Sequence, residues 1–200
     1  MNAKKNVSMK LVVLVLVAVM LFGCAVGGTL AWLQDKTEPV VNTFTEGKVD
    51  IDLYETPVGG GTTKANTYKM VPGDVLSKDP TVEVKAGSEA CWLFVKVEES
   101  ANVDTFLKYE VDTAVWTALE GVEGVYYKEI TSYTSADTTY NVLVDNKVTV
   151  KSGVGMDEMK TLDANNYPTL KFTAYAIQSA NILDTNSNGT VVDDAWAALN

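Results

Sequence analysis

Short segments in which apolar and polar residues alternate restrict the fold of this chain more than any other feature. In KVDIDLYE, residues 48–55, the side chains of Val49, Ile51 and Leu53 fall on one face, and those of Asp50, Asp52 and Tyr54 fall on the other. In CWLFVKVE, residues 91–98, every second residue is again apolar. A period of two residues is that of a β-strand with one face in a core. These segments therefore predict strands.

The rest of the chain predicts more strands, separated by turns, and few helices. Gly- and Pro-rich loops are expected at residues 56–67 and 70–80, and a hairpin turn at residues 145–147 between the two strands beside it. Strands are expected at residues 81–85, 91–98, 124–130, 138–145, 147–151 and 169–178, and short helices within residues 102–111, 155–165 and 191–200. Many short strands with regular turns predict an all-β fold, an antiparallel two-sheet jelly-roll-like sandwich with a few short helices.

The first 32 residues have the order of an export signal. Lys4, Lys5 and Lys10 precede the apolar run LVVLVLVAVMLF, residues 11–22, and small residues follow it. Two other interpretations stay open. The uncharged stretch of residues 11–32 is long enough for an uncleaved membrane anchor, and Cys24 in LFGC lies where a lipoprotein would be lipidated. The sequence favours a cleaved signal peptide over residues 1–32.

Charge and histidine content exclude several classes of function. The chain holds 16 Lys plus Arg, all of them Lys, against 26 acidic residues, for a net charge of −10. That sign opposes binding to nucleic acid or to anionic lipid. Because the chain contains no His, it cannot hold a Ser-His-Asp triad, a Cys-His pair or an H-E-x-x-H zinc site. A pair of carboxylates and a Ser-Lys pair remain as chemistries, but neither has a local signature. We therefore expect no enzymatic activity and no catalytic residues.

One segment resembles half of a calcium-binding loop. In DTNSNGTVVDDA, residues 184–195, Asp184, Asn186 and Asn188 occupy positions 1, 3 and 5, and Gly189 occupies position 6. Position 12, normally a bidentate Glu, is Ala195. A weak calcium site and a plain polar turn are the two interpretations, and no other cofactor is expected.

The residues around the end of the leader carry a family resemblance. GGTLAWLQDKTEPVVNTFTEGKVDIDL contains the pattern N-x-F-x-x-G-x-V-x-I at Asn42, Phe44, Gly47, Val49 and Ile51. Further matching stretches are MVPGDVLSKDPTVEVKAGSEACWLFVKVE and FTAYAIQ. In these features the chain resembles the TasA/camelysin family of exported proteins.

This resemblance implies both a fold and a function. Its best-understood members are jelly-roll subunits of fibres in the extracellular matrix of biofilms, released by a dedicated signal peptidase. Their mature N-terminal segment is thought to insert as a strand into the next subunit. Other members carry a metalloprotease label. In this chain the apolar candidates for insertion are Leu33, Val40, Val41 and Phe44.

Together these inferences predict a signal peptide over residues 1–32, a possible donor strand over residues 33–47 and one β-sandwich domain over residues 48–200. The expected function is that of a secreted matrix or cell-surface fibre subunit. It would associate with itself and with a signal peptidase during export, and with a membrane only through the leader. The alternatives are a secreted metalloprotease of camelysin type and a monomeric surface-binding module. For residues 33–47, a loose tail is the alternative to a donor strand.

We predict that the mature N-terminus lies at or near Leu33, after Ala31 or Trp32. The reason is that the small-residue run GGTLA ends the apolar stretch and charge begins at Asp35. N-terminal sequencing of the exported protein tests this. A chain that starts at a lipidated Cys24, or that keeps Met1, would contradict it.

Overall fold

The computed structural model describes residues 8–31, 47–57, 63–185 and 190–199, and the side chains of residues 21–31 are not included in that description. The chain divides into two compact units, Met1–Thr45 and Glu46–Asn200. The first unit contains one helix, α1 (Met9–Ala31). In the part of the chain covered by this description, no helix is long and apolar enough to cross a membrane.

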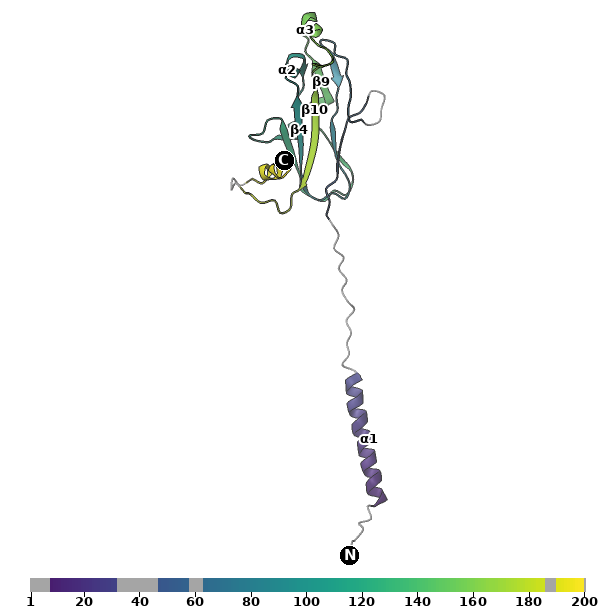
Figure 1. Cartoon of the computed structure of the whole chain (residues 1–200). Coiled ribbons are helices and arrows are strands. Elements are labelled where there is room, and N and C mark those ends of the chain that lie inside the picture. Colours follow the sequence, from purple (N-terminus) through teal and green to yellow (C-terminus); the bar gives the residue numbers. More distant parts are fainter. Residues whose placement is uncertain (1–7, 32–46, 58–62, 186–189, 200) are drawn as a thin grey trace. The chain divides into compact units, whose positions relative to one another are not determined.

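The second unit is built mainly from short antiparallel strands (Figure 1). Three short helices, α2 (Val103–Phe106), α3 (Met156–Lys160) and α4 (Val192–Ala197), and one 3-10 turn, η1 (Val144–Asn146), connect or cover them. The strands are β1 (Ile51–Tyr54), β2 (Val75–Ser77), β3 (Thr81–Val84), β4 (Cys91–Glu99), β5 (Leu107–Lys108), β6 (Thr117–Ala118), β7 (Val125–Ile130), β8 (Thr138–Asn141), β9 (Lys147–Val150) and β10 (Leu170–Gln178). The prediction of an all-β fold with antiparallel sheets and few short helices is confirmed.

Hydrogen bonding groups these strands into three sheets with the orders β1-β3-β8, β10-β4-β7-β6 and β2-β9-β5. The longest pairing joins β4 to β10, and it runs without interruption from Cys91 with Gln178 to Glu99 with Leu170. Figure 1 shows these two strands side by side, with α2 and α3 at one end of the unit. Strand β4 lies between β10 and β7 and is therefore one of the two inner strands of this four-stranded sheet.

Alternation along β4 separates two apolar clusters, one on each face of its sheet. The larger cluster, which we call the main core, contains the side chains of one face of β4, as the alternation predicts. These are Cys91, Leu93, Val95 and Val97, and all are buried. The largest side chain in this core is that of Trp116, whose Nε1 donates a hydrogen bond of 2.8 Å to the carbonyl oxygen of Asn141. A buried indole needs such a partner, because an unpaired N–H would lose the hydrogen bonds that it makes in water.

The opposite face of the same sheet carries a second cluster, which we call the outer cluster. It contains Phe94 of β4 and Ala195 of α4, both fully buried. The ring of Trp196 lies 5.3 Å from the rings of both Phe94 and Tyr175, measured between centroids. This cluster explains why residues 91–98 contain apolar residues at nearly every position, because both faces of β4 are covered.

Two predictions about the segments around turns are wrong, one on strand pairing and one on a missed strand. The strands beside the expected turn at residues 145–147 do not form a hairpin, because β8 pairs with β3 while β9 pairs with β2 and β5. The turn itself is real, with Asp145 and Asn146 at φ values of 52° and 54°. Residues 70–80, expected to be turns throughout, contain strand β2. Turn residues fix a change of direction but do not decide which strand the chain pairs with next.

Two glycines between β6 and β7 allow a matched test of packing against β4. Both have positive φ, 76° at Gly121 and 72° at Gly124. A Cβ at Gly121 would meet nothing within 4 Å, whereas a Cβ at Gly124 would lie 2.6 Å from the carbonyl oxygen of Val97. The carbonyl oxygen of Gly124 also accepts a 2.7 Å hydrogen bond from the Val97 amide. Strand β4 therefore approaches this turn too closely for a side chain.

We predict that Gly121→Ala lowers the free energy of unfolding by about 1–2 kcal/mol, the cost of a left-handed backbone for an L-residue. Gly124→Ala should lower it clearly further, since its methyl group must also displace β4. Urea denaturation of both variants measures the difference. Equal losses would show that the turn yields without disturbing β4.

Candidate functional site

The most distinctive surface feature of the second unit is the edge formed by β10. Each of its nine residues, Leu170 to Gln178, pairs with β4, and β10 is the terminal strand of that sheet. Among the residues described, no strand pairs with its other side. Within the described part of the chain, the backbone N–H and C=O groups on that side have no strand partner, which is the condition for adding a strand.

This edge lacks the features that usually protect an edge strand. Such strands commonly carry several charges, a proline or a bulge. In β10 the single charged residue is Lys171, and it lies near the start of the strand. Its Nζ lies 2.8 Å from Oε2 of Glu98, and this hydrogen bond raises the pKa of the lysine. The following residues, FTAYAIQ, contain no charge, proline or glycine, so nothing in them opposes pairing.

Packing on both faces holds the β10 edge in place. Phe172, Ala174 and Ala176 contact the main core, while Tyr175 and Ile177 contact the outer cluster. Because these side chains are already fixed, an incoming strand would meet an ordered backbone and would not have to order it. The edge is thus a preorganised surface for strand addition.

The terminal strand of a second sheet lies near the first edge. Strand β1 is terminal in its own sheet, and its Cα atoms come within 8 Å of Cα atoms in β10. The two strands are not paired with each other. The amide and the carbonyl oxygen of Leu53 in β1 are hydrogen-bonded to the side chains of Asp52 and Lys64, so this second edge is already partly occupied.

The predicted assembly residues Leu33, Val40, Val41 and Phe44 lie outside the described residues. Their part in assembly stays a prediction. Leu53, in contrast, is described, and it packs on the main core together with Val49 and Ile51. The first strand therefore buries its own apolar face.

The calcium hypothesis is only partly covered by the described residues. Asp184 is described, whereas Asn186 and Asn188 lie outside that part of the chain. Asp194 accepts hydrogen bonds from the backbone amide of Thr185, at 3.2 Å, and from its hydroxyl group. Within the described ranges, no three His, Cys, Asp or Glu side chains are grouped as metal ligands. Calcium binding stays a prediction.

A hollow of about 800 Å³, which we call the groove, was not predicted from the sequence. Its walls come from segments far apart in the chain, so no local pattern marks it. Apolar side chains form much of the lining, and aromatic, amide and hydroxyl groups add polar contacts, a composition common in ligand sites. The lining residues are Asn66, Thr67, Tyr68, Lys69, Met70, Leu76, Lys78, Leu107, Val148, Met159, Leu162, Ala164, Asn165, Tyr167, Pro168, Thr169 and Leu170.

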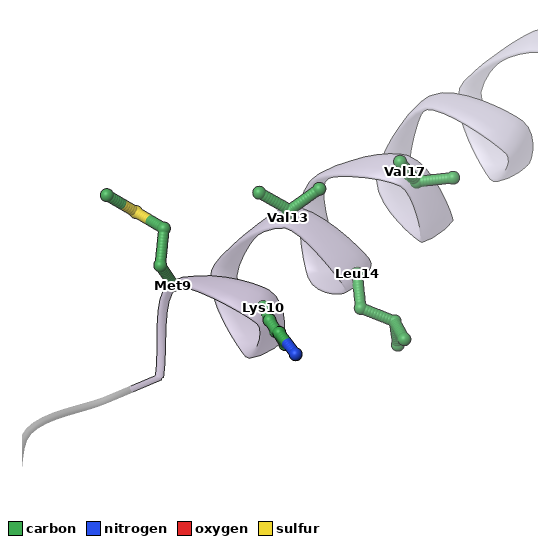
Figure 2. Close-up of a pocket in the computed structure, with 5 residues that line it drawn as sticks. All are labelled: Met9, Lys10, Val13, Leu14 and Val17. Atoms are coloured by element: carbon green, nitrogen blue, oxygen red, sulfur yellow. The ribbon is translucent and has the colours of Figure 1, made fainter.

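A second hollow lies along helix α1 and is lined by Met9, Lys10, Val13, Leu14 and Val17 (Figure 2). Figure 2 shows that all five side chains project from one stretch of a single helix. A ligand there would touch only one surface, whereas binding sites usually enclose most of their ligand. We therefore do not regard it as a ligand site.

No family model, curated protein or solved structure matches the chain.

The position of Cys91 is that of a structural residue. Its side chain is fully buried in the main core, and burial raises the pKa of the thiol to about 11. The thiolate is the reactive form of cysteine. The position therefore disfavours a nucleophilic role for Cys91.

We predict that Cys91 in the folded protein, with Cys24 replaced by serine, does not react with a thiol reagent at pH 8. About one thiol in a thousand would be ionised at that pH, and the reagent could not reach it. The same protein unfolded in urea should react fully. Labelling followed by mass spectrometry provides the measurement, and equal rates in the two states would contradict the assignment.

Proposed function

We propose that this chain is an exported structural subunit of an extracellular biofilm matrix or surface fibre, and that it assembles by donation of its N-terminal segment as a strand. The observation that carries the proposal is the β10 edge, which is long, uncharged after Lys171 and unpaired among the described residues. The proposal also follows the resemblance of the N-terminal sequence to the TasA/camelysin family. It makes no use of a catalytic group.

A two-sheet, jelly-roll-like sandwich is the architecture that fits this role. Two of the hydrogen-bonded sheets can be joined into one layer, because the chain continues past β8 to pair Leu143 with Val111, beyond β5. The amide of Asp112 donates to the carbonyl of Val142, and the amide of Val144 donates to that of Glu110. These bonds support one layer with the order β1-β3-β8-β5-β9-β2, opposite the layer β10-β4-β7-β6.

The chemistry of donation is that of strand addition. An extended segment satisfies the open backbone groups of an edge, and its alternate side chains enter apolar pockets. Residues 33–47 offer Leu33, Val40, Val41 and Phe44 for this purpose. Burying each large apolar side chain would contribute about 1.5–3 kcal/mol. Because donor and acceptor are different surfaces, the contact is head-to-tail and extends into a fibre instead of closing into a dimer.

Export is the second part of the proposal, and its support is the order of charge, apolar run and small residues in residues 1–32. The described apolar side chains of α1, such as Leu14 and Leu16, are exposed. An export signal needs this property, since its apolar residues must contact the export machinery. The expected location is the extracellular matrix or the cell surface.

A monomeric surface-binding module is the second candidate, and the groove is the observation that favours it. A binding module would use the groove and remain monomeric, whereas a fibre subunit would use the β10 edge and polymerise. The metalloprotease alternative lacks any histidine ligand in the sequence. Assembly is therefore the property that separates the two remaining functions.

We predict that deletion of residues 33–43 leaves a folded, soluble monomer that forms no fibres. The reason is that Val49, Ile51 and Leu53 already give β1 its own core face. A melting curve and electron micrographs of the purified mature chain and of the truncated chain test this. Unfolding of the truncated chain would place the segment in the subunit's own core. Persistent fibres would refute donation by this segment.

A matched pair of substitutions tests the acceptor. Thr173→Glu places a charge in the β10 edge opposite Lys96 of β4, so its effect on stability should be small. Thr117→Glu makes the same change in β6, the strand at the other edge of that sheet. We expect the change at Thr173 to suppress fibres and the change at Thr117 to leave them intact. The reverse result would move the acceptor away from β10.

A further inference from the structure

A lysine and a glutamate form a mostly buried ion pair beside the groove. Nζ of Lys78 lies 2.6 Å from Oε1 of Glu55, and each side chain is only 12% exposed. The other ion pairs among the described residues involve at least one side chain that is 35% exposed or more. Burying two charges is costly unless further groups compensate for the lost water.

Aromatic rings surround the lysine amine. Nζ of Lys78 lies 5.6 Å from the centre of the Tyr68 ring and 5.2 Å from the centre of the Phe172 ring. Rings stabilise a cation by their electron-rich faces, but they also keep water away from it. The rings and Glu55 together hold the amine at a fixed place where it is largely shielded from water.

The side-chain carboxamide of Asn66 is hydrogen-bonded to the second carboxylate oxygen of Glu55. Nδ2 of Asn66 donates a hydrogen bond of 2.9 Å to Oε2 of Glu55, and the hydroxyl of Tyr68 donates to that oxygen at 3.3 Å. Burial and the charge of Glu55 raise the pKa of Tyr68 to about 12, so this phenol remains a hydrogen-bond donor at neutral pH. One glutamate thus binds the amine of Lys78 through one oxygen and the carboxamide of Asn66 through the other.

The backbone around the cluster fixes these groups. Glu55 and Thr63 form a β-bridge, with N–O distances of 2.9 and 2.8 Å in the two directions, and this bridge brings residue 66 back toward the end of β1. Lys78 follows directly after β2, and its amide donates to the carbonyl of Asn146. The arrangement therefore depends on three separate parts of the chain.

From this geometry we propose that Lys78 and Asn66 join in an intramolecular isopeptide bond, with Glu55 as the proton-transferring group. An amine that is desolvated and deprotonated is a nucleophile, and the amide carbon of Asn66 is its electrophile. A plain ion pair would not need the carboxamide. The proposal concerns the second unit alone and does not depend on fibre assembly.

The reaction needs no external reagent. Glu55 takes a proton from the Lys78 ammonium group, and the neutral amine attacks Cγ of Asn66. In the tetrahedral intermediate, Glu55 gives that proton to Nδ2 and takes a second one from Nζ. The Cγ–Nδ2 bond breaks, Nδ2 leaves as ammonia, and Nζ and Cγ remain joined as an amide. Glu55 then returns its proton to solvent, so it is unchanged overall.

Intact mass is the direct test. The purified wild-type protein should be about 17 Da lighter than its sequence requires, the mass of one ammonia. Lys78→Arg and Glu55→Gln should each restore the full mass expected for that variant. Lys85→Arg is the matched control, because Lys85 also pairs with a glutamate, Glu83, but outside this cluster. It should keep the loss.

Digestion of the same samples with trypsin provides a second, independent measurement of the cross-link. After unfolding, trypsin should fail to cut after Lys78 in the wild type, and the peptides that contain Asn66 and Lys78 should remain joined. A wild-type protein of full mass that is cut after Lys78 would overturn the proposal. So would a loss of ammonia that persists in Lys78→Arg, since it would come from another group.

Discussion

The pairing of β4 with strands on both sides is the constraint on which the rest of the second unit depends. β10 and β7 form continuous ladders along it, and its two faces supply both apolar clusters. Adjacent residues of β4 therefore belong to different clusters. Leu93 lies in the main core, and Phe94 lies in the outer cluster. A shift of one residue in the pairing of β4 would exchange these side chains and disrupt both clusters.

This constraint explains which parts of the fold could be predicted from the sequence. Alternation placed Cys91, Leu93, Val95 and Val97 on one face, because the period of a strand depends only on local geometry. The same reasoning located β1 through Ile51 and Leu53. Pairing between strands depends on contacts between distant residues, so the wrong hairpin between β8 and β9 had no local signal to prevent it. Strand β2 was missed because proline and glycine at positions 72 and 73 precede it.

The same distinction applies to the candidate sites. The low charge of residues 172–178 is visible in the sequence, but the position of β10 at the end of its sheet is a property of topology. The cluster of Glu55, Asn66 and Lys78 was not predicted. Each residue lies at the end of a predicted strand or in a predicted loop, and neither pattern indicates that the three side chains meet. Among 26 acidic residues, nothing local distinguishes a buried Glu55 from a solvated carboxylate. Burial and partners are what give these residue types their chemistry.

Helix α4 has a consequence for local dynamics. It has six residues, and its N-cap residue is Val191, whose side chain cannot accept a hydrogen bond from the first turn. A helix this short has little stability of its own, so the contacts of Trp196 with Phe94 and Tyr175 must hold it in place. Residues 190–199 can then detach as a separate cooperative unit, at a free energy below that of global unfolding. Detachment would uncover the aromatic face of β4 and β10 while the main core remains intact, and amide hydrogen exchange in α4 would be faster than in β4.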